Sequence, residues 1–242
     1  MTDPAVATAG PSRERVWHMF DRIAHRYDLL NRLLSGGTDV AWRKAMARHL
    51  PAGDNLQVLD LATGTADVLL FLEQQSSRLG TSVGSDMSAG MLHLGNEKLR
   101  KRGLDQRFRL VRSDATDLVF QDQTFDVVTI SFGIRNVLSV EGALREMHRV
   151  LRPGGRAMVL EFSLPANRPF RALYLWYFRN ILPLLGGLIS GDRYAYRYLN
   201  QTVETFPYGE AFCQLMRDAG FENVRGLPFT FGIATLYLGD KP

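Results

Sequence analysis

Short β-branched and aliphatic runs alternate with helical patterns between residues 57 and 163, and this alternation constrains the fold more than any other feature of the sequence. The strand-like runs are QVLDLA (57–62), TSVGSDM (81–87), FRLVRSDA (108–115), FDVVTISF (125–132) and RAMVLEFS (156–163), and the helical patterns cover 66–75, 89–102 and 140–151. Strands that alternate with helices favour a parallel sheet covered on both faces, in which the buried strands are nearly all apolar. The sequence therefore predicts an α/β fold.

A helical arm is expected before this core. Apolar side chains recur at helical spacing in the segment that precedes the first strand, with a break at Gly36 and Gly37. We predict an N-terminal helical arm over residues 16–50. Residues 1–15 contain Pro, Gly, Ser and Thr but no apolar stretch of the length that a secretory signal needs, so they are expected to form a disordered leader.

Further helices and two strands are expected after the core. Residues 164–206 predict a helical cap or substrate lid, and a further helix is expected over residues 209–219. Residues 224–238 predict two final strands that meet near Gly232. These two strands bring the mostly parallel sheet to seven. With no internal repeat and no linker, we expect one domain over residues 16–242.

Composition narrows the compartment and the partners. The chain has 29 Lys and Arg against 25 Asp and Glu, and a net charge of +4 is too small to argue for a nucleic-acid partner, although it suits a basic face near anionic lipid. A single cysteine, Cys213, excludes an internal disulfide and favours the cytoplasm. The five histidines form no ligand pattern with Cys213, so no metal site is expected.

The most apolar stretch covers residues 170–189. It approaches the ~20 residues that span a bilayer, but charged or helix-breaking residues such as Arg171, Arg179 and Pro183 interrupt it. A membrane span is therefore not expected. The stretch predicts either a cap packed on the domain or a greasy lid in peripheral contact with the inner face of the membrane.

Acidic residues lie at or near the carboxyl ends of three of the predicted strands. In an open α/β sheet, ligands bind beyond the carboxyl ends of the strands. The loop from Asp60 to Asp67 has Gly64 as its only glycine, so the GxGxxG fingerprint of dinucleotide sites is absent. Asp86, 22 residues beyond Gly64, can accept both hydroxyls of a ribose, and Asp114 can accept from the amine of adenine. The pattern predicts a nucleoside site without naming the cofactor.

With these motifs in place, the sequence resembles the class I S-adenosylmethionine-dependent methyltransferases, which have a Rossmann-like fold. VLDLATGTAD, SVGSDMS, RSDATDL, TFDVVTI and LRPGG occur in that class's order. More narrowly it is similar to the quinone C-methyltransferases of the ubiquinone and menaquinone pathways, through residues 16–43, TISFGIRNV (129–137), LEFS (160–163) and YRYLNQTVETFP (196–207). Ala62 and Ala66 depart from the class, which usually carries glycine there.

The resemblance implies S-adenosylmethionine as the methyl donor and a set of residues around it. The implied donor-binding residues are Asp60, Gly64, Thr65, Asp86, Met87, Asp114, Ala115 and Ser131. In this set, Asp60 and Gly64 shape the floor of the pocket. Asp60 would favour the donor's ammonium group directly or through water.

The implied reaction is attack by a ring carbon of a prenylated quinol on the sulfonium methyl group. The carbon becomes nucleophilic when the quinol hydroxyl loses its proton, so the enzyme must stabilise the phenolate. Arg135 and Asn136 are implied catalytic residues, and Tyr27 on the arm would bind a substrate oxygen. Demethylmenaquinol is the expected substrate, and a benzoquinol of the ubiquinone pathway stays open.

Other hypotheses remain at this point. Arg135 and Asn136 could be a capping pair that fixes their loop, and Tyr27 could simply be packed. A nicotinamide-dependent oxidoreductase would need the same acidic residue at position 86, and a nucleoside-binding module without turnover would keep the same carboxylates. A homodimer is also left open by the sequence.

Overall fold

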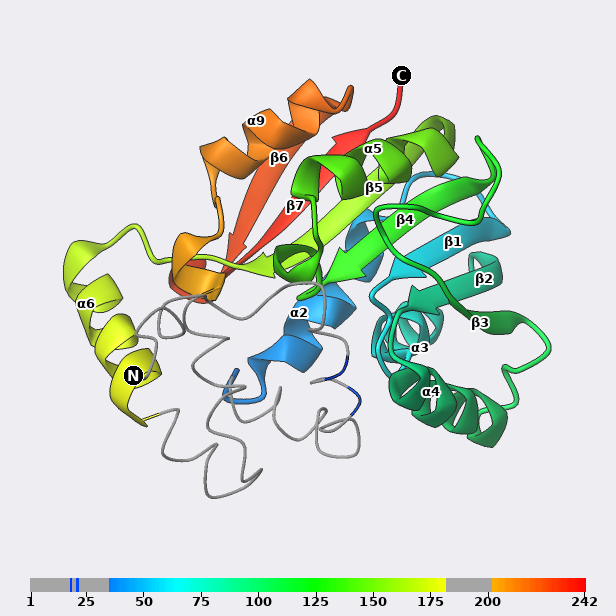
Figure 1. The fold of residues 1–242 in the computed structure, drawn as a ribbon, viewed down its shortest axis with the longest axis horizontal. Coiled ribbons are helices and arrows are strands. Elements are labelled where there is room, and N and C mark those ends of the chain that lie inside the picture. The colour runs from blue at the N-terminus through cyan, green and yellow to red at the C-terminus, as the bar shows by residue number, and fades with distance from the viewer. Residues whose placement is uncertain (1–17, 19–20, 22–34, 182–201) are drawn as a thin grey trace, which may run out of the picture.

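The computed structural model describes His18, Asp21 and residues 35–181 and 202–242. These residues form one seven-stranded sheet with strand order β3-β2-β1-β4-β5-β7-β6 (Figure 1). The strands are β1 (Leu56–Leu61), β2 (Leu79–Asp86), β3 (Phe108–Arg112), β4 (Phe125–Ser131), β5 (Leu151–Phe162), β6 (Glu222–Phe229) and β7 (Ala234–Asp240). Strands β1 to β5 pair in parallel and β7 pairs antiparallel with both β5 and β6. The predicted mostly parallel seven-stranded sheet is confirmed.

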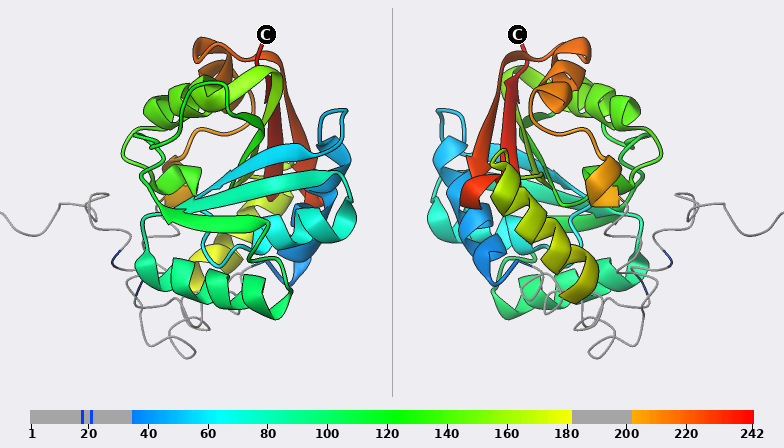
Figure 2. Two further views of the ribbon diagram at one scale, coloured as in Figure 1. Left: turned by 90° about the vertical axis from the view of Figure 1, so that its right-hand side faces the viewer. Right: turned by 90° about the vertical axis from the view of Figure 1, so that its left-hand side faces the viewer.

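Helices cover both faces of this sheet (Figure 2). The helices are α2 (Thr38–Met46), α3 (Asp67–Gln75), α4 (Ala89–Lys101), α5 (Val140–Val150), α6 (Arg168–Trp176) and α9 (Glu210–Asp218), with short helices η3 (Ala47–His49), η4 (Ile134–Asn136) and η6 (Thr230–Gly232) and a π-helical turn η5 (Tyr177–Ile181). Strand order reverses between β1 and β4, because β2 and β3 lie on one side and the later strands on the other. Ligands bind at such a point in open α/β sheets.

Two apolar clusters hold the layers together. On one face, Met46 of α2 and Leu69 of α3 pack with Val58 of β1. On the other face, Leu144 of α5 and Phe212 of α9 belong to a cluster with alternate residues of β1, β4, β5 and β7. Because successive side chains of a strand point to opposite faces, each central strand feeds both clusters. This explains why the strand sequences are apolar almost throughout.

Strand β5 begins earlier than the strand predicted over residues 156–163, because it includes the LRPGG segment. Leu151 pairs with Phe125 and Arg156 pairs with Val127, so the segment is a bulged first part of β5. Gly154 has φ 76°, which glycine adopts at low cost. The bulge allows its backbone to leave the β4 ladder while the strand stays continuous.

The described part of the predicted cap includes α6 with the turn η5 and residues 202–206, of which Val203 and Phe206 are buried. Asn167 caps the helix, its side-chain oxygen accepting from the backbone N–H of Phe170 over 3.0 Å. No residue of α6 is buried. Within the described residues, no helix is both long enough and apolar enough to cross a bilayer. Residues 182–201 of the predicted cap, the arm residue Tyr27 and residues 1–15 lie outside the described residues.

Candidate active site

The loop that follows β1 has left-handed backbone at three positions. Ala62 has φ 47°, Gly64 has φ 55° and Ala66 has φ 66°. Glycine adopts this conformation freely, whereas it costs alanine about 1 kcal/mol. A side chain on Gly133, after β4, would lie 2.5 Å from the Cβ of Ala62. The loops after β1 and β4 therefore approach closely where the strand order reverses.

Asp60, near the end of β1, is completely buried. Its carboxyl group accepts hydrogen bonds from the hydroxyls of Thr63 and Thr129, each over 2.6 Å. Burial raises the pKa of Asp60 to about 7, and the two hydroxyls and the Arg43 guanidinium oppose that rise. Near neutral pH the neutral and the charged forms of this carboxyl group are therefore both populated. A cationic ligand would favour the charged form.

Both carboxylate oxygens of Asp86, at the end of β2, accept hydrogen bonds from backbone N–H groups. Its Oδ2 accepts from the N–H of Gly64 and its Oδ1 from the N–H of Ser88, each over 2.9 Å. Burial raises the pKa of Asp86, and these two N–H groups oppose the rise. Each carboxylate oxygen can accept more than one hydrogen bond, so acceptor positions remain for the hydroxyls of a ribose. The residues present fit the predicted nucleoside.

Asp21, near the start of the predicted arm, reaches this edge of the sheet. The Oδ1 of Asp21 accepts from the N–H of Gly90 over 3.0 Å and from the hydroxyl of Ser88. Both donors lie at the N-terminus of α4, where the helix dipole favours a carboxylate. Together with burial, the charge of Asp21 raises the pKa of Asp86. Asp21 is a residue at the predicted site that the sequence analysis missed.

Three predicted residues follow β2 and β3. The Oδ1 of Asp114 accepts from the N–H and the hydroxyl of Thr116, over 2.8 and 2.7 Å. Ala115 is buried beside it. The carbonyl of Met87 accepts from Nε of Arg112, the last residue of β3, over 3.0 Å. The loops after β2 and β3 are thus joined, as the predicted nucleoside site requires.

Two predicted hydroxyl residues, Thr65 and Ser131, are buried. The hydroxyl oxygen of Thr65 accepts from the ammonium of Lys98 over 2.7 Å, and the same ammonium donates to Asp67 over 2.6 Å. Lys98 thereby ties α4 to the loop after β1. The Oγ of Ser131, at the end of β4, has no hydrogen-bond partner among the described residues. Such buried hydroxyls are uncommon unless a ligand or water completes them.

Arg135, in η4 after β4, is buried beside Glu161 of β5. Its Nη1 donates to Oε1 of Glu161 over 2.6 Å and to the carbonyl of Phe132 over 2.7 Å. Burial raises the pKa of Glu161, while the charge of Arg135 opposes the rise. The Nε of Arg135 has no partner in the described part of the chain. Arg135 therefore fixes its loop, as one hypothesis held, and also keeps an unsatisfied donor.

Glu161 was missed as a functional candidate, although it lies in the LEFS motif. It is separated from Arg135 by 26 residues, and the pairing of β4 with β5 is what brings the two together. Asn136 is half-buried in η4, and its backbone N–H donates to the carbonyl of Gly133 over 3.0 Å. Tyr27 lies outside the described residues.

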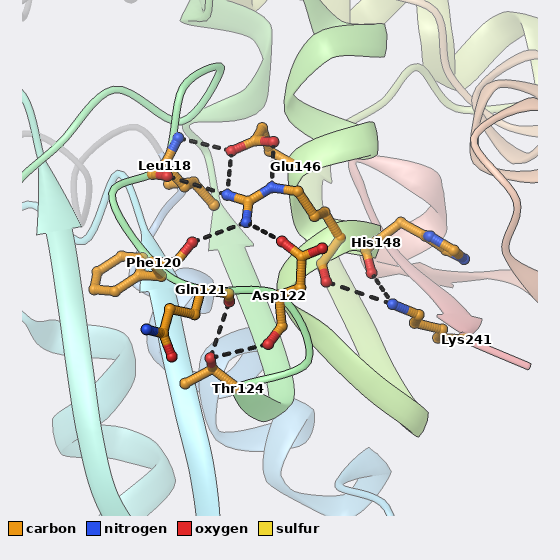
Figure 3. Close-up of polar contacts among 9 residues, drawn as sticks. Leu118, Phe120, Gln121, Asp122, Thr124, Glu146, His148 and Lys241 are labelled. Atoms are coloured by element: carbon orange, nitrogen blue, oxygen red, sulfur yellow. Dashed lines mark hydrogen bonds and ion pairs between the residues drawn. The ribbon is translucent and has the colours of Figure 1, made fainter.

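The loop that begins with Asp114 is held in place by Arg149 of α5 (Figure 3). The Nη2 of Arg149 donates to the carbonyl of Leu118 over 3.1 Å and its Nη1 to that of Phe120 over 2.8 Å. The remaining donors reach Glu146 and Asp122. All five N–H groups of this guanidinium are therefore used, which fixes the loop between β3 and β4.

A solved structure described as a SAM-dependent methyltransferase, possible histamine N-methyltransferase, from Thermotoga maritima shares this fold. Its TM-score is 0.64 at 20% sequence identity, and the match covers 93% of this chain and 99% of that chain. The strand order and this likeness confirm the predicted Rossmann-like fold of the class I methyltransferases.

Sequence relatives name the family. Demethylmenaquinone methyltransferase of Thermus thermophilus is 47% identical over 224 residues, covering 93% of this chain and 100% of that protein. Ubiquinone/menaquinone biosynthesis C-methyltransferase UbiE of Geobacter sulfurreducens is 45% identical over 228 residues, covering 94% and 89%. Residues 9–241 match the ubiE/COQ5 methyltransferase family. The chain belongs to this family.

Membership confirms three predictions. The chain is a C-methyltransferase, its methyl donor is S-adenosylmethionine, and quinone biosynthesis is the setting of the family's chemistry. The nicotinamide oxidoreductase and the module without turnover are set aside, because both were alternatives to this family.

Proposed function

We propose that the protein methylates a ring carbon of a prenylated quinol, with demethylmenaquinol as the substrate. The names of its relatives in Thermus thermophilus and Bacteroides fragilis support the naphthoquinol, and the name of the Geobacter sulfurreducens relative keeps a benzoquinol as the second candidate. S-adenosylmethionine supplies an electrophilic methyl group. The chain itself has to orient the quinol and stabilise its phenolate.

The single observation that carries this proposal is the buried guanidinium of Arg135, which holds Glu161 through Nη1 and keeps Nε without a partner among the described residues. Arginine stays protonated, so it stabilises an oxyanion and does not act as the base. Asn136, next to it in η4, would orient the ring oxygen, and Tyr27 would bind a substrate oxygen. Asp86, Asp114, Ala115 and the other predicted donor-binding residues would hold the nucleoside.

The experiment supplies purified protein with S-adenosylmethionine and with chemically reduced short-chain demethylmenaquinol or the corresponding benzoquinol. We expect the naphthoquinol to gain one methyl group on carbon, detected by mass spectrometry. Arg135→Gln should lower kcat by about 10²- to 10³-fold, because an oxyanion loses its charged donor, while the affinity for the donor stays unchanged. Methylation of the benzoquinol alone would reverse the substrate assignment.

Arg145→Gln is the matched control, since Arg145 is an exposed arginine on α5. It should leave both kcat and donor affinity unchanged. Equal losses of kcat and donor affinity in Arg135→Gln would show that Arg135 fixes its loop and does not stabilise the phenolate. If neither quinol is methylated by the wild-type enzyme, the proposed substrate class is wrong.

We further propose that the enzyme meets its substrate from the cytoplasm at the membrane surface. Leu173, Trp176 and Phe231 are 61%, 56% and 84% exposed. The ring of Phe170 packs edge-on against that of Phe231, with centroids 5.6 Å apart, so α6 and η6 form one surface, the α6–η6 face. Arg168 is exposed on the same helix, and α6 contains no acidic residue. Aromatic and aliphatic side chains beside arginines suit an anionic lipid surface.

A further inference from the structure

A second buried arginine lies on the other side of the site from Arg135. Arg43, on α2, is 5% exposed, and its Nη1 forms an ion pair with Asp39, one helical turn earlier. The hydroxyl of Ser35 donates to the other carboxylate oxygen of Asp39 over 2.7 Å. The Nε of Arg43 has no hydrogen-bond partner in the described part of the chain. One edge of the guanidinium is therefore anchored and a donor on it is unsatisfied.

The surroundings of Arg43 place it at the ends of β1 and β4. Its Cζ lies 5.4 Å from the centre of the Phe132 ring, which directly follows β4. Its charge also acts on Asp60 of β1, where it opposes the rise in pKa that burial causes. Ser131, the residue before Phe132, carries the buried hydroxyl without a described partner. Unsatisfied donors thus gather beside the one buried carboxyl group predicted to face the donor's ammonium.

Unsatisfied buried donors are costly, and a charged one more so than a neutral one. Their accumulation at one edge of a sheet therefore indicates a ligand that completes them. The ligand must present a hydrogen-bond acceptor to Arg43 and a cation to Asp60. It therefore carries two neighbouring groups of opposite charge. An α-amino acid has this pattern, with a carboxylate and an ammonium on the same carbon. Guanidinium is the side chain best matched to a carboxylate.

We propose that Arg43 binds the α-carboxylate of the amino-acid portion of the methyl donor. The inference rests on S-adenosylmethionine being the donor and adds a residue to its site. Asp39 is a positioning residue in this arrangement, because it holds Nη1 and leaves the remaining donors of the guanidinium to the ligand. The rings of Phe132 and Phe162 pack against each other with centroids 4.5 Å apart, and the Cζ of Arg135 lies 5.4 Å from the centre of the Phe162 ring.

The test compares two ligands that differ only in this carboxylate. Binding of S-adenosylmethionine and of decarboxylated S-adenosylmethionine is measured by calorimetry, without turnover. We expect Arg43→Gln to weaken S-adenosylmethionine binding by about 10- to 100-fold, the effect of losing a hydrogen bond between charged groups, and to leave the decarboxylated ligand unchanged. Arg43→Lys, which keeps the charge but not the planar fork, should recover part of the loss.

Arg48→Gln is the matched control, because Arg48 is exposed in η3 and loses the same charge. It should not change the binding of either ligand. Since Arg43→Gln leaves Asp39 buried without its cation, the double variant Arg43→Gln/Asp39→Asn is measured beside it, with thermal unfolding as the check on folding. In the double variant we expect the same selective loss of S-adenosylmethionine binding.

Equal weakening of both ligands, in variants that remain folded, would assign Arg43 to structure alone. So would wild-type protein that binds the two ligands equally well. If the wild type bound S-adenosylmethionine tightly but methylated no quinol, the proposed substrate would fail and the assignment of Arg43 could still be decided by the two ligands.

Discussion

The pKa of about 7 that burial gives to Asp60 makes donor binding depend on pH. If the donor's ammonium requires the charged carboxylate, binding below about pH 7 must first remove a proton from Asp60, and affinity falls up to about tenfold per pH unit. Above that pH the affinity levels off. We therefore expect the affinity for S-adenosylhomocysteine, measured by calorimetry, to rise from about pH 5.5 to 7 and then stay constant.

Asp60→Asn isolates this group. It should bind S-adenosylhomocysteine more weakly, with an affinity that no longer rises across the same pH range. Asp86 also has a raised pKa, again because of burial. If the affinity of Asp60→Asn still rises with pH, the titrating group is Asp86.

Ala62 has a backbone conformation that is unfavourable for alanine. Its φ of 47° lies where alanine is strained and glycine is not, and its side chain is only partly buried. We expect Ala62→Gly to raise the free energy of unfolding by about 1 kcal/mol, which raises Tm by roughly 2–4 °C in a protein of this size. Calorimetric unfolding measures the change. Ala41→Gly, at an exposed position inside α2, should instead lower stability by about 0.5–1 kcal/mol. A loss in both variants would contradict the strain argument.

At the scale of elements, Arg149 of α5 decides how firmly the loop between β3 and β4 is held. Arg149→Gln removes the donors to two carbonyls and two carboxylates in Figure 3, so we expect about 1–3 kcal/mol of lost stability and faster amide exchange in that loop. Because Asp114 begins the loop, donor affinity should also fall. Hydrogen exchange by mass spectrometry checks the first effect. Arg145→Gln on the same helix serves as the control, and unchanged exchange in Arg149→Gln would contradict the assignment.

The elements were largely predictable because their signals are local. The period of apolar residues indicated β1 to β5 and the helices between them, and short-range spacing placed Asp60, Asp86 and Asp114 near the carboxyl ends of β1, β2 and β3. The bulge in β5 was not predictable in the same way. It depends on which residue of β4 pairs with Arg156, and a sequence pattern carries no record of register between strands.

The same distinction applies to the site. Arg135 was predicted because a motif marked it, whereas Glu161, Asp21 and Arg43 acquire meaning only through contacts. Asp21 meets Ser88 across 67 residues, and Arg43 meets the Phe132 ring through the packing of α2 on the sheet. Because these contacts join residues that are far apart in the sequence, the spacing of charged residues along the chain does not distinguish them from ordinary surface residues.

For the whole molecule, the α6–η6 face predicts how the enzyme meets lipid. We expect the protein to sediment with vesicles containing anionic phosphatidylglycerol and much less with neutral phosphatidylcholine vesicles. The double variant Leu173→Gln/Phe231→Gln should weaken this binding by about tenfold or more, because two apolar side chains no longer enter the interface. Val119→Gln, which changes an apolar side chain that is 73% exposed away from this face, should bind like the wild type. Equal vesicle binding by the wild type and both variants would contradict the proposal that the α6–η6 face binds lipid.

The contact between the rings of Phe132 and Phe162 bears on attempts to redesign the enzyme. Arg43 lies over the ring of Phe132 and Arg135 over the ring of Phe162, so a smaller residue at position 162 would remove the ring beneath Arg135 and the ring that packs against Phe132. A substitution at position 162 that is meant to alter the surroundings of Arg135 would therefore also change the packing of the ring beside Arg43. In helix α6, Leu173 and Trp176 are exposed and can be exchanged at little cost to the interior, whereas Tyr174 stacks on the buried ring of Phe178 and should be kept.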